Sequence, residues 1–151
     1  MLAIALAAAI QATGPLIVLG VSPNAALLFD ERSVRPHGEF IRYDQISIPS
    51  SPEPFHGGRV TRATRFQYQV DCLTGSIQPV GFVLIDGTGA ELAAHPGSAG
   101  ISMSRPPAGS AGEKAAQIAC GREGDATESE RFADIPTAIS EYYRVLSSLR
   151  G

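Results

Sequence analysis

The segment VTRATRFQYQVDC, residues 60–72, has a strictly alternating pattern of side chains. Apolar residues occupy the even positions from Phe66 to Cys72, and polar residues occupy the odd positions from Arg65 to Asp71. Side chains that alternate with a period of two lie on opposite faces of a β-strand. The pattern therefore predicts a strand with one face against a core and the other face toward water.

A second strand-like segment follows this one after a short turn. Residues 73–76 (LTGS) are turn-forming, and residues 77–86 (IQPVGFVLID) are rich in apolar and β-branched side chains. The two segments predict a central antiparallel hairpin. The turn DGTG, residues 86–89, predicts a second hairpin with residues 90–94.

The residues before the central hairpin also contain strand-like segments. Residues 15–21 and 39–48 are predicted strands, and 25–30 is a short apolar run that ends in charge. Residues 31–38 (ERSVRPHG) are predicted to form a turn because of their proline and glycine. Three prolines and two glycines predict a loop over residues 49–58.

The last part of the chain is predicted to be helical. Apolar residues recur from Ile135 through Ile139 to Leu149 with the spacing of an amphipathic helix, which we expect over residues 134–150. Asp134 can cap its start. We expect the helix to pack on the sheet; docking of its apolar face on a partner, such as a second copy, is the alternative. Residues 113–119 are predicted to form one or two helical turns, and 121–131 a polar connector.

The composition indicates one domain and argues against nucleic-acid binding. The chain has 151 residues, 44% of them hydrophobic, which is enough for a single core; we assign residues 15–151 to one domain. The net charge of −3 offers no basic excess to neutralise phosphates.

The first part of the chain predicts export. Residues 1–29 contain no charged side chain, and residues 1–12 (MLAIALAAAIQA) resemble the apolar region of a signal peptide, although no basic residue precedes Arg32. The alternatives are an uncleaved membrane anchor that extends to Val21, or a buried segment. A contact with the membrane is expected only if this segment is uncleaved.

Two cysteines, Cys72 and Cys120, agree with an exported protein. An even number of cysteines in an oxidising compartment favours a disulfide, and two unpaired buried thiols are the alternative.

No combination of residues in the sequence predicts a catalytic, cofactor or metal site. His37, His56 and His95 lie in three separate turn-like segments beside proline or glycine, where exposed turn histidines are expected. The segment GSAGEK, residues 109–114, lacks the spacing of a phosphate-binding loop. We therefore expect a protein that is not an enzyme and binds no cofactor.

Candidate partner-binding residues lie on the polar face of the central strand. Arg65, Gln67 and Gln69 share this face, where they can contact an acidic or polar partner surface. Their alternative role is to form an ordinary solvated surface.

The order of several motifs resembles the bacterial surface-adhesin protein E family. The motifs are LLFDERSVRPHGEFIRYDQISI (27–48), VDC (70–72), FVLIDGTGAEL (82–92) and a PAGS loop (107–110) that leads to Cys120. The chain departs from the family by having no cysteine in residues 1–30 and no tryptophan.

The resemblance implies an α+β domain, a Cys72–Cys120 disulfide and an extracytoplasmic location. We accordingly expect a single antiparallel sheet of about five to six strands with the C-terminal helix packed on it. In the best-known family members the function is adhesion to host extracellular-matrix proteins. Because the chain has no counterpart of the lipid-anchoring cysteine, both a periplasmic and a cell-surface location stay open.

Two functions follow as expectations. The first is a non-enzymatic envelope protein that binds an extracellular or envelope protein through its exposed sheet face and loops, as a monomer or a homodimer. The alternative is a periplasmic protein that binds a small ligand between the sheet and the C-terminal helix, near Tyr142 and Tyr143.

Overall fold

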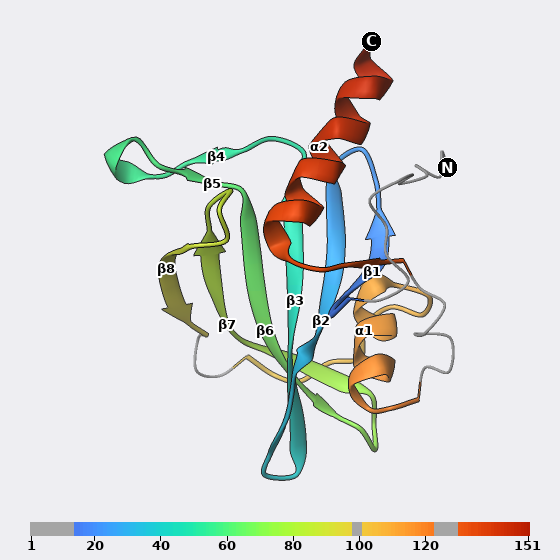
Figure 1. The fold of residues 1–151 in the computed structure, drawn as a ribbon. Helices are drawn as coiled ribbons and strands as arrows, with labels where there is room; N and C mark the ends of the chain where they lie inside the picture. Colours follow the sequence, from blue (N-terminus) through green and yellow to red (C-terminus); the bar gives the residue numbers. More distant parts are fainter. Residues whose placement is uncertain (1–13, 98–100, 123–129) are drawn as a thin grey trace.

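The computed structural model describes residues 14–97, 101–122 and 130–151, so the predicted leader, residues 1–12, lies outside the described residues. Seven strands form one antiparallel sheet in the order β8-β7-β6-β3-β2-β1-β9 (Figure 1). The strands are β1 (Leu16–Val21), β2 (Ala25–His37), β3 (Phe40–Pro49), β6 (Ala63–Asp71), β7 (Ser76–Ile85), β8 (Glu91–Pro96) and β9 (Arg131–Phe132).

The predicted α+β class with a C-terminal helix is confirmed, but the predicted single sheet of five to six strands is wrong: the main sheet has seven strands, and two short strands form a second sheet. The additional strand, β9, pairs with β1 at the edge of the sheet. It lies at the end of the segment that was predicted to be a polar connector. Two residues are too few to show any periodicity, and an arginine followed by a phenylalanine gives no strand signal of its own.

Two helices cover opposite faces of the sheet. α2 (Ile135–Arg150) packs on one face, and α1 (Ala111–Ala119) packs on the other. Figure 1 shows α2 crossing the upper part of the sheet, whereas α1 lies beside β1 and β2. Neighbouring residues of one strand therefore enter different cores: Leu16 packs with the α2 residues and Ile17 with the α1 residues, and both are fully buried.

The central strand β6 follows the predicted alternation, with one correction. Its odd-numbered face was expected to meet only water, but Ala63 on that face is fully buried under α2. On the even-numbered face, Val70 is fully buried in the core that contains α1. α2 thus covers the odd-numbered face of β6 at the start of the strand, and the core with α1 covers the even-numbered face at its end.

The β2–β3 hairpin is longer than predicted. Residues 31–37 continue β2 as far as His37, and the turn consists of Gly38 and Glu39. Pro36 is tolerated because β1 pairs with β2 only as far as Asp30, so no strand on that side needs its missing N–H. Residues 49–58, predicted to be a loop, contain β4 (Glu53–Pro54) and a 3₁₀ turn (His56–Gly58), and β4 pairs with β5 (Val60–Thr61) in a projecting hairpin.

The C-terminal helix was predicted correctly. The Asp134 side chain accepts a hydrogen bond from the Thr137 N–H at 2.8 Å, and a proline lies in the first turn. The helix packs its apolar face on the sheet, although Leu149, the last residue of the predicted stripe, is 52% exposed. α1 is longer than expected because Ser110 caps it: Ser110 Oγ accepts the Glu113 N–H at 3.2 Å.

Candidate functional site

The predicted partner-binding residues lie in one row on β6, on the sheet face that α2 covers at its other end. The register places Gln67 opposite Asp44 and Gln69 opposite Arg42 of β3, so side chains of both strands project from the same face. We call this surface the polar face. Its residues are Arg42, Asp44, Arg65, Gln67, Gln69, Gln78 and Glu91.

Ion pairs on the polar face converge on a buried carboxylate. Asp44 is only 9% exposed; its Oδ1 lies 3.6 Å from Arg35 Nη1, and its Oδ2 lies 3.9 Å from Arg65 Nε. Arg65 also donates from Nη1 to Glu91 Oε1 at 2.9 Å. Burial raises the pKa of Asp44 more than the two arginines lower it. Arg65 therefore pairs with two carboxylates of the chain itself, which leaves few of its hydrogen-bond donors for a partner.

The amides of the polar face are also paired with one another. Gln69 donates from Nε2 to Gln78 Oε1 at 3.0 Å, and Arg42 Nε donates to Gln69 Oε1 at 3.5 Å. Arg42 makes no other side-chain hydrogen bond or ion pair with the described residues. The terminal nitrogens of Arg42 are consequently the cationic donors on this face that are most available to a partner.

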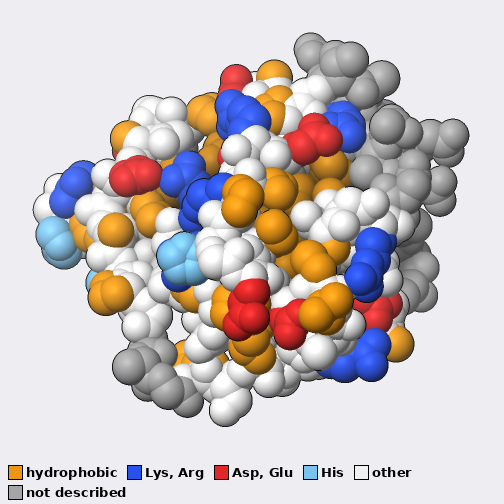
Figure 2. Space-filling model, turned by 90° about the horizontal axis from the view of Figure 1, so that it is seen from below, with side chains coloured by type: hydrophobic (Ala, Val, Ile, Leu, Met, Phe, Trp, Pro, Cys, Tyr) orange, Lys and Arg blue, Asp and Glu red, His pale blue; other side chains and the backbone are white. Residues whose placement is uncertain are grey.

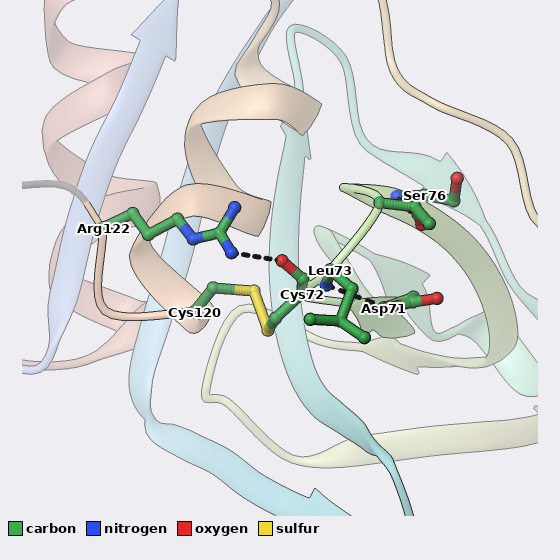
Figure 3. The surroundings of a disulfide bond; sticks show 7 residues. Asp71, Cys72, Leu73, Ser76, Cys120 and Arg122 are labelled. Atoms are coloured by element: carbon green, nitrogen blue, oxygen red, sulfur yellow. Dashed lines mark hydrogen bonds between the residues drawn. A yellow bond between two sulfur atoms is a disulfide. The ribbon is translucent and has the colours of Figure 1, made fainter.

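The second candidate region surrounds a disulfide. Cys72 and Cys120 are bonded, with Cα atoms 5.7 Å apart, which rules out two free thiols. The bond ties the end of β6 to the residue that ends α1 (Figure 3). Arg122 reaches across and donates from Nη2 to the Cys72 carbonyl oxygen.

A cavity of about 760 Å³ opens beside this disulfide; we call it the disulfide cleft. One wall is the β6–β7 turn and the other is formed by α1 and by the residues on either side of it. Its lining residues are Val70, Cys72, Leu73, Thr74, Gly75, Arg105, Pro106, Glu113, Ala116, Gln117, Cys120 and Arg122.

Sequence reasoning did not identify this cleft. The two cysteines were recognised, but Arg105 and Arg122 are 17 residues apart and share no motif. One signal was present: Leu73 is a large apolar residue inside the turn sequence LTGS, where polar residues and glycine are usual.

The pocket predicted near Tyr142 and Tyr143 is filled by packing. Tyr142 is 1% exposed and donates its hydroxyl hydrogen to the Ser22 carbonyl at 2.9 Å. Tyr143 donates to the Pro49 carbonyl at 3.0 Å. In the part of the chain that the structure describes, neither the disulfide cleft nor a neighbouring cavity of about 500 Å³ is lined by a residue of α2.

The three histidines are exposed and lie apart, but only His56 lies in a turn; His37 and His95 belong to strands, so the prediction of three turn histidines was wrong for these two. His37 ends β2, His56 lies in the 3₁₀ turn against the Phe55 ring, and His95 stacks on Phe82. Within residues 14–97, 101–122 and 130–151, no three His, Cys, Asp or Glu side chains form a group that could hold a metal ion. Neither described helix is long and apolar enough to cross a membrane.

Comparisons with known proteins agree with this architecture. A family model described as surface-adhesin protein E matches residues 17–121. The fold is similar to that of the crystal structure of protein E from non-typeable Haemophilus influenzae, with a TM-score of 0.56 and 16% sequence identity, over 91% of this chain and 90% of that chain. At this identity the likeness concerns the fold. No curated protein matches the chain.

Proposed function

The chain belongs to the surface-adhesin protein E family, and on that premise we propose that it is a non-enzymatic exported protein that binds a macromolecular partner through its polar face. The partner is an extracellular or envelope protein, and the binding surface is centred on Gln67 and Gln69 with Arg42 opposite them. The chain acts at the cell surface or in the periplasm.

One observation carries the choice of surface. α2 covers the β6 face at Ala63 but leaves the continuation of that face open, and there the strands present guanidinium and amide groups instead of apolar ones. Cross-strand rows of such groups form a flat surface without a catalytic cluster. Arginine is enriched at protein interfaces because its planar fork can pair with carboxylates and carbonyls.

The disulfide supports the exported location. Disulfides form and persist in oxidising compartments and are rare in the cytosol. Intact mass of the protein recovered from the host cell envelope, alkylated before and after reduction, tests this point. We expect alkylation only after reduction; two thiols that alkylate without reduction would contradict export.

The binding surface is tested with a triple variant, Arg42→Ala/Gln67→Ala/Gln69→Ala. Binding of the full chain to a panel of purified extracellular-matrix and envelope proteins is measured by biolayer interferometry. For a protein that binds the native chain, we expect the triple variant to bind about tenfold more weakly or worse, because several interface hydrogen bonds are lost together. The control is Arg150→Ala, an exposed arginine at the far end of α2.

Two outcomes would contradict this assignment. If the triple variant keeps the native affinity while its circular dichroism is unchanged, the polar face is not the binding surface. If no matrix or envelope protein binds the native chain, the proposed function fails. Sedimentation of the native chain tests separately whether it is a monomer or a homodimer.

A further inference from the structure

The disulfide cleft is lined by two arginines whose side chains make few bonds to the described residues. Arg105 lines the cleft and makes no side-chain hydrogen bond or ion pair with any described residue. Arg122 uses one donor on the Cys72 carbonyl, and a guanidinium has five. Two arginines thus face the same cavity with most of their donors available.

The carboxylate that lines the same cleft already has a role. Glu113 lies in the first turn of α1, where a negative charge is stabilised by the helix dipole, and its Oε1 accepts the Gly109 N–H at 3.1 Å. The Ser110 cap and this Glu113 bond together hold the start of α1, although Glu113 accepts the N–H of Gly109 and not that of the cap residue itself. Glu113 is therefore committed to holding the helix start, and the cleft keeps a cationic excess.

The backbone fixes Arg122 in place. α1 ends in a Schellman motif: Gly121 adopts a φ of +71°, its N–H bonds to the Ile118 carbonyl at 3.0 Å, and the Arg122 N–H bonds to the Gln117 carbonyl at 2.8 Å. The disulfide at Cys120 immediately precedes these two residues. The motif holds the backbone of Arg122, and the bond to the Cys72 carbonyl restrains its side chain, which lowers the conformational cost of binding.

An apolar side chain is presented beside these cations. Leu73 is 93% exposed at the tip of the β6–β7 turn. Its N–H bonds to Asp71 Oδ1 at 2.9 Å, and the Gly75 N–H bonds to the Asp71 carbonyl at 2.8 Å. Figure 2 views the molecule from the end at which this turn lies, and hydrophobic side chains gather on this face among both basic and acidic ones.

The cleft continues beyond the size of a single small anion. The neighbouring cavity of about 500 Å³ shares Arg105 and Pro106 with it and extends along the sheet to Tyr68 and Gln45. A groove with a cation in the middle and apolar contacts on both sides suits an extended chain better than an isolated ion. Arginine clusters on other proteins recognise acidic peptide segments in this way.

We propose that the disulfide cleft binds an acidic peptide segment of a partner protein, with a carboxylate against Arg105 and Arg122 and an apolar side chain against Leu73. This site is separate from the polar face and does not depend on it. It would give the chain a second means of recognition, selective for negative charge next to an apolar residue.

The experiment uses synthetic decapeptides that contain Asp-Asp-Leu or Glu-Glu-Leu between varied flanking residues, each beside a twin with Asn-Asn-Leu or Gln-Gln-Leu. The full chain with its disulfide intact is applied to this array. The tightest acidic peptide is then measured by fluorescence polarisation. We expect acidic peptides to bind more tightly than their neutral twins, and the preference to shrink as salt is raised, because the attraction is screened.

Variants identify the site. Arg105→Gln is expected to weaken binding by about tenfold, since one charge-assisted hydrogen-bonding group is lost. This variant removes no bond within the described structure, so its fold is expected to be unchanged. Leu73→Ser is expected to weaken binding severalfold, whereas Arg150→Gln and the polar-face triple variant keep the native Kd. The triple variant therefore separates this proposal from the proposed function.

Several results would overturn the proposal. Equal binding of acidic peptides and their neutral twins, or no binding of either, would do so. An Arg105→Gln chain with the native Kd would do so as well. If N-acetylaspartate competes as well as the best peptide, the occupant is a small organic anion. If sedimentation shows a dimer that Arg105→Gln dissociates, the occupant is a second copy of the chain.

Discussion

The polar face and the disulfide cleft both contain arginine side chains, but these arginines differ in how many hydrogen bonds and ion pairs they make within the fold. On the polar face, Arg65 pairs with Glu91 at 2.9 Å and lies 3.9 Å from the buried Asp44. In the cleft, Arg105 has no hydrogen-bonding or ionic partner among the described residues, and Arg122 has one carbonyl. On the polar face Arg65 is paired within the fold and Arg42 is the cation left available, whereas both arginines of the cleft keep most of their donors available among the described residues.

The difference separates charges that support the fold from charges that are available for binding. A guanidinium that already bonds a carboxylate must exchange that partner for a new one, so the gain on binding is small. A guanidinium that is exposed to water gives up only water when it binds. The comparison predicts that substitutions on the polar face change stability more than equivalent substitutions in the cleft.

Removal of the disulfide is the largest change that can be made to the cleft. The bond joins residues 48 apart in the sequence, and on the chain-entropy model the Cys72→Ser/Cys120→Ser variant loses about 4 kcal/mol of stability. Guanidinium chloride unfolding measures the loss. A loss below about 1 kcal/mol would show that packing of α1 alone holds the cleft together.

The second test compares one substitution at two sites. Arg65→Ala leaves the buried Asp44 with Arg35 alone and is expected to cost about 1–2 kcal/mol, because a partly buried charged pair is broken. Arg105→Ala is expected to change stability by less than about 0.5 kcal/mol, since no described bond is lost. Thermal and urea unfolding of the two variants gives the comparison directly. Equal costs would contradict the distinction between the two regions.

The third test uses pH to examine the buried carboxylate. Burial raises the pKa of Asp44 above its ordinary value, so the folded chain binds this proton more tightly than the unfolded chain does. As the pH falls from neutral through that raised pKa, the native chain should therefore gain stability relative to Asp44→Asn, whose amide does not titrate. Urea unfolding of both chains at neutral pH and at about pH 4 measures the difference.

The opposite sign would show that the arginines dominate at this site. If Arg35 and Arg65 lowered the pKa of Asp44 overall, the native chain would lose stability relative to Asp44→Asn on acidification. The same measurement thus determines whether the polar face is held by its ion pairs or only tolerates a buried charge.

The local features of the fold were readable from the sequence because each has a short-range cause. Alternation from Phe66 to Cys72 predicted β6, and the Asp134 cap with the apolar spacing after it predicted α2. The sequence did not predict in the same way which part of each sheet face a helix covers. It depends on where α1 and α2 pack, and this is a long-range outcome that leaves no mark in the pattern of β6.

The candidate sites show the same limit. Arg65, Gln67 and Gln69 were grouped correctly because strand parity alone places them on one face, but Asp44, their neighbour, comes from a strand about 20 residues earlier in the chain. In the cleft, the disulfide brings Leu73 and Arg122 together although 49 positions separate them. Such groupings require the register and the disulfide pairing, which the spacing of residues does not give.

Leu73→Ser is the smallest change and tests whether the cleft is shaped for binding. With 93% of the leucine exposed, the substitution should alter the free energy of unfolding by less than about 0.5 kcal/mol. Val70→Ser, three positions earlier in β6 and fully buried, is the matched control and should cost about 2 kcal/mol or more. Urea unfolding compares the two variants. If Leu73→Ser costs as much as Val70→Ser, the leucine stabilises the fold and is not held in reserve for a partner. If it costs nothing, the fold gives no reason for a leucine in this turn, and contact with a partner is the reason that the structure supports.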